Sequence, residues 1–330
     1  MSRIGLGLTS AVLALALSGC AGLVAGAGGE SPSGQPAQEG KAAKVEKPTP
    51  TPTPHPTDPP IQLEDLLGSD GRLSVLILGS DWREGIVGER TDAIIVASID
   101  PVSGKVAMAS LPRDTVNVPI GPNRVYAGRI NNLYWDFQRS SGKKRVALKK
   151  TRKALEYAFD TEIDYYALFD FKGLVRLVNS IGGIEVTLDE PLIDPTMRLG
   201  KRGLRLKAGA RKLDGKTALA FTRSRYSDSD YARSGRQQQV ISAAAQKVRE
   251  RGASSLPALV ELATKKITTD IPLAAAPILL DLAIRAKLTS PKSRILAPGR
   301  WARPGPSQYT ISPRIKEVRK MFDRVFRPLR

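Results

Sequence analysis

The run LSVLILG at residues 73–79 constrains the fold of this chain more than any other feature. A continuous apolar stretch that ends in glycine is typical of a strand buried on both faces. Residues 93–99 and 106–111 continue the strand pattern, and the turn DPVSG joins them. Further strands are predicted at 165–169, 184–188 and 294–296, and helices at 146–159, 171–179, 216–223, 237–251, 255–265, 273–287 and 313–326. This alternation predicts one α/β domain in which helices cover a mixed sheet.

The first twenty residues have the pattern of an export signal. Arg3 precedes an uncharged run of about 14 residues, which is the length of a secretory core and short for a transmembrane helix. The run ends in Leu17-Ser18-Gly19-Cys20, which resembles a bacterial lipobox whose cysteine is lipidated. An ordinary cleaved signal with a coincidental cysteine is the alternative. We expect residues 1–20 to be a lipoprotein signal peptide and the protein to be extracytoplasmic, anchored to the bacterial cell membrane through Cys20.

Residues 21–72 are predicted to be a disordered tether rich in proline and threonine. The stretch KPTPTPTPHPTDPP favours polyproline II, which makes either a spacer that holds a domain off a membrane or a linker of no particular length. The catalytic domain is predicted to occupy 73–330, with its core at about 73–272 and a C-terminal helical completion at 273–330.

The predicted domain contains neither histidine nor cysteine, because His55 and Cys20 are the only such residues in the chain. Nucleophilic catalysis of the Ser-His-Asp or Cys-His type is therefore excluded, as are the usual zinc and haem ligands. The formal net charge of +19 indicates a polyanionic partner, which can be nucleic acid, anionic lipid or a phosphate-bearing substrate. Any catalysis must use carboxylates, arginines, lysines, hydroxyls or an oxygen-preferring cation.

Two carboxylates flank the junction between the first two predicted strands. Asp81 follows the first strand in the motif GSDWR, and Asp92 precedes the second in ERTDA. Ligands of α/β folds gather at the carboxyl ends of strands, so the two side chains converge if these strands are neighbours. Two carboxylates without histidine suit Mg²⁺, which binds through one or two carboxylates and substrate phosphates. The alternative is that each aspartate caps a turn.

Two further motifs carry arginines at positions where anions bind. Arg113 follows the third predicted strand in SLPRD and is either a phosphate ligand or a surface partner of Asp114. Arg129 lies in GRINN, where a helix is predicted to begin, and helix N-termini favour anions.

The stretch RSRYSDSDYARSGRQQQ at 223–239 combines four arginines with two aspartates and a run of glutamines. Planar guanidinium groups suit bidentate recognition of phosphate, and several of them would neutralise a diphosphate through its transition state. The alternative is a solvated helix start with charges of both signs. The charged residues of the stretch are Arg223, Arg225, Asp228, Asp230, Arg233 and Arg236, and Gln237 opens a run of three glutamines.

With these motifs in place, the chain resembles the LytR-CpsA-Psr family, whose members attach glycopolymers to bacterial peptidoglycan. The resemblance covers about 73–272, and the combination of LPRD with the later arginine-rich stretch is specific, whereas SLPRD alone is not. The matching segments are LGSDWR (78–83), ERTDA (89–93), SLPRD (110–114), GRINN (128–132), IDYYALFDFKG (163–173), IGGIEV (181–186), LDGKTALAFTRSRYSDSDYARSGRQQQ (213–239) and KKITTDIP (265–272).

The resemblance implies a single three-layer α/β/α domain with a mixed central sheet and an apolar groove for a polyprenyl chain. It implies transfer of a glycosyl-phosphate from an undecaprenyl-pyrophosphate carrier to peptidoglycan, with release of polyprenyl phosphate. Mg²⁺ is the implied cofactor, on Asp81 and Asp92 with Arg90 close by. The pyrophosphate is expected on Arg83, Arg113, Arg129, Arg223, Arg225, Arg233, Arg236 and Gln237. Asp228 and Asp81 are both candidates for the general base, which stays unassigned.

Members of this family usually carry an N-terminal transmembrane helix, whereas this chain carries the lipobox pattern at Cys20. Two other classes of function compete with the transferase. A non-catalytic protein that binds polyprenyl phosphate or a wall polymer would keep the arginines without needing both Asp81 and Asp92. A transcriptional attenuator would fit the charge, but an export signal and the lack of a helix-turn-helix pattern or an aromatic-lined basic surface argue against a nucleic-acid partner.

Overall fold

The computed structural model describes residues 60–326, except 84, 86, 201, 227 and 228. The chain divides into two units, Met1–Thr57 and Asp58–Arg330, and every described residue belongs to the second. The predicted signal peptide, its Cys20 and the tether up to residue 59 lie outside the described residues. Within the described part, no helix combines the length and the apolar character that crossing a membrane requires.

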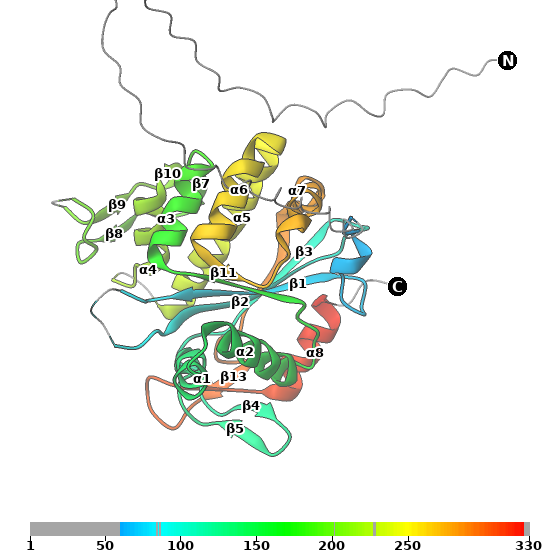
Figure 1. Ribbon diagram of the computed structural model, residues 1–330. Helices are drawn as coiled ribbons and strands as arrows, with labels where there is room; N and C mark the ends of the chain where they lie inside the picture. Colours follow the sequence, from blue (N-terminus) through cyan, green and yellow to red (C-terminus); the bar gives the residue numbers. More distant parts are fainter. Residues whose placement is uncertain (1–59, 84, 86, 201, 227–228, 327–330) are drawn as a thin grey trace, which may run out of the picture. The chain divides into compact units, whose positions relative to one another are not determined.

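Helices and strands alternate along most of the described chain (Figure 1). The α-helices are α1 (Leu133–Ser141), α2 (Lys144–Phe159), α3 (Phe171–Ser180), α4 (Gly215–Arg223), α5 (Asp230–Arg251), α6 (Leu256–Lys265), α7 (Ala276–Arg285) and α8 (Ile315–Phe326). The strands are β1 (Leu73–Ser80), β2 (Thr91–Ile99), β3 (Lys105–Ser110), β4 (Val118–Gly121), β5 (Arg124–Tyr126), β6 (Tyr165–Phe169), β7 (Ile184–Leu188), β8 (Leu192–Asp194), β9 (Leu204–Leu206), β10 (Gly209–Leu213), β11 (Ile267–Thr269), β12 (Lys287–Ile295), β13 (Ala302–Pro304) and β14 (Ile311–Pro313). Short 3₁₀ helices are η1 (Glu64–Leu66), η2 (Ile130–Asn132), η3 (Gly252–Ser255) and η4 (Leu273–Ala275).

A six-stranded sheet in the order β11-β6-β1-β2-β3-β12 forms the centre of the domain. β1 pairs antiparallel with β2 and parallel with β6, and β3 pairs parallel with β12, so the sheet is mixed. β4-β5, β7-β10, β8-β9 and β13-β14 form separate pairs. This confirms the predicted α/β class with a mixed central sheet.

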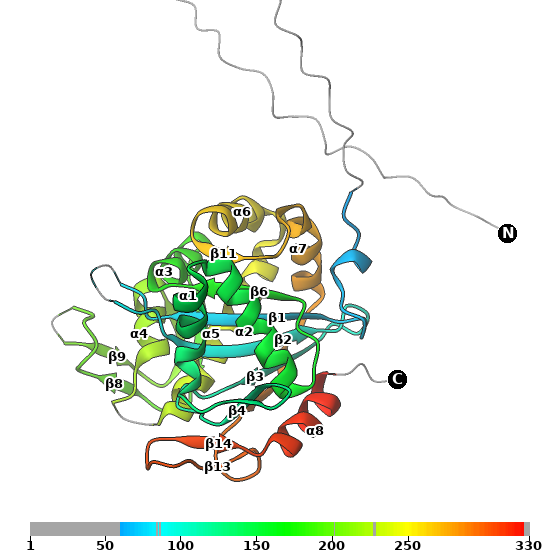
Figure 2. The ribbon, with the colours of Figure 1, turned by 60° about the horizontal axis from the view of Figure 1, so that its bottom comes forward.

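The sheet is covered on both faces because its strands alternate two sets of apolar side chains. Leu76 and Leu78 of β1 are fully buried in the core that also holds α1, α2 and α8. Ile77, between them, points to the opposite face, as strand geometry requires. In two views α6 and α7 lie on one side of the sheet and α8 on the other (Figures 1 and 2). A second core joins α3, α4, α5, β7 and β10, and the result is a three-layer α/β/α arrangement.

The predicted elements agree with the structure wherever the sequence pattern is long and regular. α5 is the main exception, because it begins at Asp230 and not near residue 237. Ser229 caps this helix through a hydrogen bond to the Ala232 N–H, and Asp230 in the first turn suits the helix dipole. The predicted helix at 273–287 is also shorter, since Lys287 already belongs to β12.

The folded part begins earlier than the predicted domain, and its C-terminal region contains strands as well as helices. Leu66 and Leu73 pack in a third core with Ala275 and Leu282, so the folded part includes residues that the sequence placed in the tether. The region after 273 is more than a helical completion, because it supplies the edge strand β12 and the helix α8. Phe322 of α8 stacks on Phe159 of α2 with ring centroids 4.6 Å apart, which makes α8 part of the main core.

Asp164, just before β6, is a half-buried carboxyl whose pKa is raised. Its Oδ2 accepts a hydrogen bond from the Ser74 N–H at 2.7 Å. Burial, helped by Glu162 and Asp70, raises the pKa of Asp164 to about 7, although the Ser74 N–H and Arg152 act in the opposite direction. Between the ordinary carboxyl pKa and a pH of about 7, Asp164 is therefore protonated in the folded protein and ionised in the unfolded chain.

This shift predicts that stability falls as pH rises from about 4 to about 7, because the unfolded state then binds fewer protons than the native state. Asp164→Asn keeps an accepting oxygen for Ser74 but cannot ionise, so its Tm should fall less over this window than that of the wild type. Glu317→Gln, which removes a carboxyl from the surface of α8, should follow the wild type. The same slope for Asp164→Asn and wild type would contradict the assignment.

Candidate functional site

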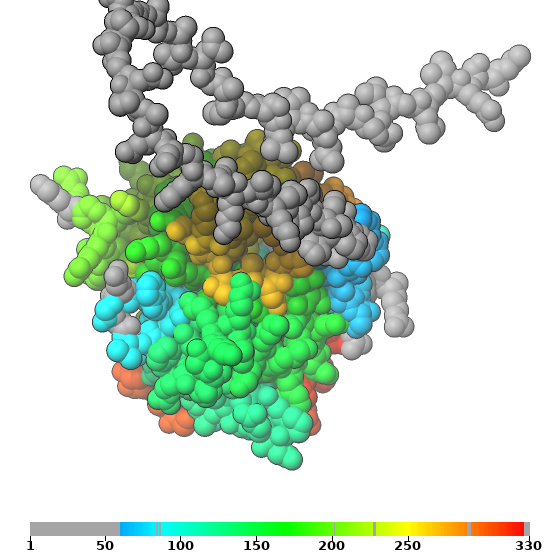
Figure 3. Space-filling view, viewed as in Figure 1, coloured from blue at the N-terminus to red at the C-terminus, as the bar shows by residue number. Residues whose placement is uncertain are grey.

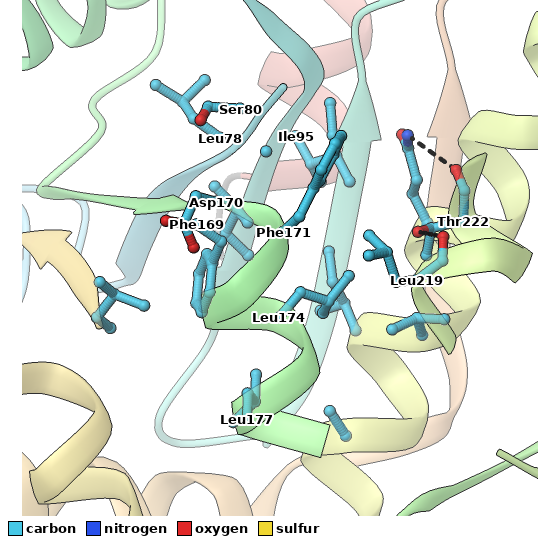
Figure 4. A pocket seen from close by; sticks show the side chains of 18 of the residues that line it. Leu78, Ser80, Ile95, Phe169, Asp170, Phe171, Leu174, Leu177, Leu219 and Thr222 are labelled. Carbon is cyan, nitrogen blue, oxygen red and sulfur yellow. Dashed lines mark hydrogen bonds between the residues drawn. The ribbon is translucent and has the colours of Figure 1, made fainter. Parts of the chain in front are cut away.

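A cavity of about 1210 Å³ lies between the central sheet and the helices α3, α5, α6 and α7. Ile77 and Ile95 supply its floor from β1 and β2, and Leu174 and Leu177 line it from α3. Figure 4 shows Phe171, Leu174 and Leu177 along α3, with Leu219 and Thr222 across from them on α4. The remaining apolar lining includes Val240, Ile241, Ala244, Val248, Leu259, Val260, Ala263, Leu279, Leu280 and Ala283.

Figure 3 shows one face of the molecule, with part of the helical layer that bounds this cavity. There the α6 and α7 region, in gold and orange, lies beyond the green α1 and α2 region. The charged lining residues come from the ends of β1, β2, β6 and β8, from the segment after β3 and from the junction of α4 and α5. They are Asp81, Arg83, Arg90, Asp92, Arg113, Asp170, Asp194, Arg223, Arg225, Asp230 and Arg233.

Asp81 and Asp92 line the same cavity because β1 and β2 are adjacent strands. Ser80 pairs with Thr91, and the Asp81 N–H donates to the Arg90 carbonyl at 2.9 Å. Asp81 Oδ1 accepts from the Arg90 N–H at 2.9 Å, so each end of this junction fixes the other. The convergence that the sequence predicted for neighbouring strands is present.

Arg113 forms ion pairs with carboxylates from three segments of the chain. Its Nη1 lies 2.8 Å from Asp92 Oδ2, and its Nε lies 3.4 Å from Asp114 Oδ2 and 3.7 Å from Asp230 Oδ2. Burial alone would lower the pKa of Arg113, but Asp92, Asp230 and Asp114 raise it. Asn131 donates to the other oxygen of Asp92 at 3.0 Å, so Asp92 is held from two sides.

Asp230 is the carboxylate on which the arginine-rich stretch converges. Its Oδ1 lies 2.6 Å from Arg225 Nε and 3.4 Å from Arg233 Nη1. Burial would raise the pKa of Asp230, but Arg233, a hydrogen bond with Asp114, Arg225 and Arg113 together hold it below the ordinary value. Burial and that same hydrogen bond raise the pKa of Asp114, although Arg113 and Arg129 act to lower it. As pH rises, Asp114 is therefore the member of the Asp114–Asp230 pair that loses its proton at the higher pH.

Arg83 and Arg223 present two guanidinium groups to a single aromatic ring. Their Cζ atoms lie 5.4 Å and 4.4 Å from the centroid of Phe171. Burial and the nearby charge of Arg83 lower the pKa of Arg223, while Asp92 and Asp81 act more weakly to raise it. Within the part of the chain that the structure describes, neither arginine forms an ion pair with a carboxylate. These two cations therefore favour an anionic ligand.

Arg233 adds a buried donor to the same wall. Its side chain is 5% exposed, and its Nε has no hydrogen-bond partner among the described residues. Burial lowers the pKa of Arg233 and the charge of Asp230 opposes this. A buried N–H without a partner is costly, and a bound anion would satisfy it.

Of the other predicted site residues, one lines the cavity, two lie outside its lining and one is outside the described residues. Gln237 lines the cavity and donates to the Thr222 carbonyl at 3.5 Å. Arg129 does not line it, but pairs with Asp114 at 3.2 Å from a half-exposed position. Arg236 is buried behind the wall, where its guanidinium donates to the Phe221 and Ser224 carbonyls. Asp228 lies outside the described residues.

The sequence did not single out two carboxylates that the structure places in the cavity wall. Asp230 stands two residues from the aspartate that the sequence favoured. Asp194 of β8 is fully buried and accepts from the hydroxyls of Ser224 at 2.7 Å and Thr196 at 2.6 Å. Asp194 thereby fastens the β8 hairpin to the segment between Arg223 and Arg225. The only local signal was the Asp-Pro-Thr turn sequence at 194–196.

Asp81 and Asp92 offer only oxygen and line one cavity, which is a donor set that Mg²⁺, Ca²⁺ or Mn²⁺ can use. The described residues contain no cluster of three or more acidic, histidine or cysteine side chains suited to a metal. A cation held there would therefore depend on substrate oxygens and water for the rest of its ligands.

Comparisons with known proteins agree with this arrangement. The model of the LytR_cpsA_psr family matches residues 36–295. A curated relative, the polyisoprenyl-teichoic acid–peptidoglycan teichoic acid transferase TagU of Bacillus licheniformis, is 32% identical over 170 residues, which make up 51% of this chain and 49% of that protein. The chain thus spans about half the length of the curated relatives it matches.

Two solved structures share the fold. The crystal structure of B. subtilis TagV has a TM-score of 0.61 at 23% identity and covers 79% of this chain and 100% of its own. The structure of TagT bound to LI-WTA has a TM-score of 0.57 at 23% identity, covering 77% of this chain and 89% of its own. At these identities the match concerns the fold alone.

Proposed function

Since this chain belongs to the LytR_cpsA_psr family, we propose that it transfers a cell-wall glycopolymer from a polyprenyl-pyrophosphate carrier to peptidoglycan. One observation carries the proposal: the guanidinium pair of Arg83 and Arg223, with no carboxylate partner among the described residues, lines a large cavity whose walls on α6 and α7 are apolar. A polyprenyl pyrophosphate has the matching chemistry, with a charged head and a long hydrocarbon tail. The teichoic acid transferase name of the related TagU supports the same class of reaction.

In this proposal the hydrocarbon chain occupies the cavity between the sheet and α3, α5, α6 and α7. Burial of apolar surface then supplies most of the affinity for the carrier. The pyrophosphate lies on Arg83 and Arg223 and reaches the free Nε–H of Arg233. Arg113 and Arg225 already contact carboxylates, so they hold Asp92 and Asp230 in place as well as adding positive charge.

The proposed reaction is a displacement at phosphorus. A hydroxyl oxygen of peptidoglycan attacks the phosphorus atom that bears the glycan, and the bond from this phosphorus to the bridging oxygen breaks. Polyprenyl phosphate leaves with the electron pair of that bond, and a carboxylate of the cavity takes the hydroxyl proton. Such a transfer needs alignment and charge neutralisation more than a covalent nucleophile, so a site without histidine suffices.

Asp81 and Asp92 are the residues that would hold Mg²⁺, which would add positive charge next to the substrate phosphates. We expect Asp81→Asn to raise the Mg²⁺ concentration for half-maximal transfer by about tenfold, because it removes one charged ligand. The measurement is the transfer rate at a series of Mg²⁺ concentrations after treatment with a chelator. Asp160→Asn, which neutralises a carboxylate outside the cavity lining, is the control. An unchanged Mg²⁺ dependence of Asp81→Asn would move the metal elsewhere.

The proposed function is tested most directly by mass spectrometry of lipid that copurifies with the protein, followed by transfer in vitro. A copurified polyprenyl phosphate or pyrophosphate, and release of polyprenyl phosphate when donor and peptidoglycan are both supplied, are the expected results. Binding of the lipid without release would favour a non-catalytic carrier protein. Lipid-free protein that retards DNA would overturn the proposal. A peptidoglycan acceptor lies outside the cytoplasm, which agrees with the lipidation that the sequence predicts at Cys20.

A further inference from the structure

A second hollow of about 410 Å³ adjoins the main cavity on the side of α4 and the β8-β9 hairpin. It shares Arg83, Thr196, Met197, Leu219 and Arg223 with that cavity, so these residues form the partition between the two spaces. Its remaining lining residues are Arg198, Leu199, Lys216 and Ala220. The mixture of small apolar, hydroxyl and cationic side chains is suited to a polar ligand of modest size.

The charges around this hollow are all positive. Arg198 follows β8, and Lys216 lies in the first turn of α4. Both are exposed, and within the described part of the chain neither forms an ion pair. With Arg83 and Arg223 they make four cationic lining residues and no acidic one.

The carboxylates near this hollow are already engaged or lie outside it. Asp194 is fully buried and accepts hydrogen bonds from Thr196 and Ser224. Asp214 attracts Lys216, but its Oδ1 caps α4 through the Thr217 N–H at 2.7 Å, and it does not line the hollow. The carboxylates that act on Arg223 are Asp92 and Asp81, which line only the main cavity. The positive charge of the hollow is therefore available to a ligand.

We propose that this hollow is a specificity subsite for an anionic sugar at the glycan end of the donor, with a carboxylate or phosphate group of that sugar on Arg198 and Lys216. The inference rests on the proposed function, which places the pyrophosphate on Arg83 and Arg223. Because those arginines also line the hollow, a substituent of the pyrophosphate that points away from the lipid enters it. Exposed cations are screened by water, so the subsite contributes selectivity and a moderate gain in affinity.

The test measures binding of three soluble donors to the full chain by calorimetry at one ionic strength. The donors are geranyl pyrophosphate esters of glucose, of glucuronic acid and of glucose 6-phosphate. We expect the wild type to bind one or both anionic donors about five- to tenfold more tightly than the glucose donor. The better of the two anionic donors identifies the group as carboxylate or phosphate.

The double variant Arg198→Met/Lys216→Met should bring the ratio of anionic to neutral affinity to about one. Its matched control is Arg205→Met/Lys212→Met, which removes the same charge from exposed positions on β9 and β10 and should keep the wild-type ratio. Wild-type protein that binds all three donors equally, or a double variant that retains the preference, would overturn the subsite while leaving the proposed function intact. Failure of every donor to bind wild-type protein would overturn both.

Discussion

Replacing Arg223 with alanine is expected to lower kcat/KM for glycopolymer transfer by about 100-fold to about 1000-fold. Its guanidinium lines the main cavity and has no ion pair within the described residues, so its charge serves the ligand and not the fold. Charge develops on the phosphate oxygens in the transition state, and a donor that is already fixed there stabilises this charge without having to reorient. The rate of polyprenyl phosphate release from a defined donor measures the effect.

Two further variants separate this role from a general loss of charge. Arg223→Lys keeps the charge but loses the planar fork, so its activity should fall between those of wild type and Arg223→Ala. Arg176→Ala removes an exposed arginine of α3 that does not line the cavity, and it should retain wild-type kcat/KM. If Arg223→Ala retained more than about a third of wild-type activity, the pyrophosphate would have to bind elsewhere.

Replacing Arg236 with methionine is expected to lower the free energy of unfolding by about 2 to 4 kcal/mol. Arg236 is buried, its Nε donates to the Phe221 carbonyl at 3.0 Å, and its Nη2 donates to the Ser224 carbonyl. Methionine fills similar volume but leaves both carbonyls at the end of α4 without these donors. The loss should appear as a lower midpoint in urea, with the slope of the transition unchanged.

Lys247→Met on the same helix is the control, since its ion pair with Glu250 is at the surface and should contribute less than about 1 kcal/mol. The sequence predicted Arg236 as a pyrophosphate ligand, and the two roles give different results. A variant of wild-type stability that no longer binds the donor would support the ligand role. A destabilised variant whose folded fraction still binds the donor would support the structural one.

The four inner strands of the central sheet, β6, β1, β2 and β3, could be predicted from sequence because each is an apolar run whose burial is a local property. The run at 73–79 became β1, and the turn at 100–104 joins β2 to β3 as expected. Of the edge strands, β11 was not predicted and β12 only in its last residues, and β4, β5, β8, β9, β10, β13 and β14 also escaped prediction, since strands of three to five residues carry almost no periodicity. Their pairing depends on contacts with distant parts of the chain.

The candidate site also contains residues whose positions could be predicted from sequence and residues whose positions could not. Asp81 and Asp92 could be placed together because adjacent strands bring their ends together. The sequence favoured Asp228 and did not single out Asp230, because the position of Asp230 in the cavity wall depends on the residue at which α5 begins, and Ser229 sets that start. The resemblance placed Arg233 and Arg236 together at the pyrophosphate, yet Arg233 lines the cavity and Arg236 turns to the carbonyls of α4. That difference comes from how α5 rotates against its neighbours.

The contact between the start of the described chain and α7 has a mechanical meaning. Ile61 and Leu66 pack against Leu282 on one side of α7, while Leu279, Leu280 and Ala283 of the same helix line the main cavity. Tension applied to the chain ahead of Pro60 would therefore load this contact before it reached β1. The same helix thus anchors the start of the domain and bounds the cavity.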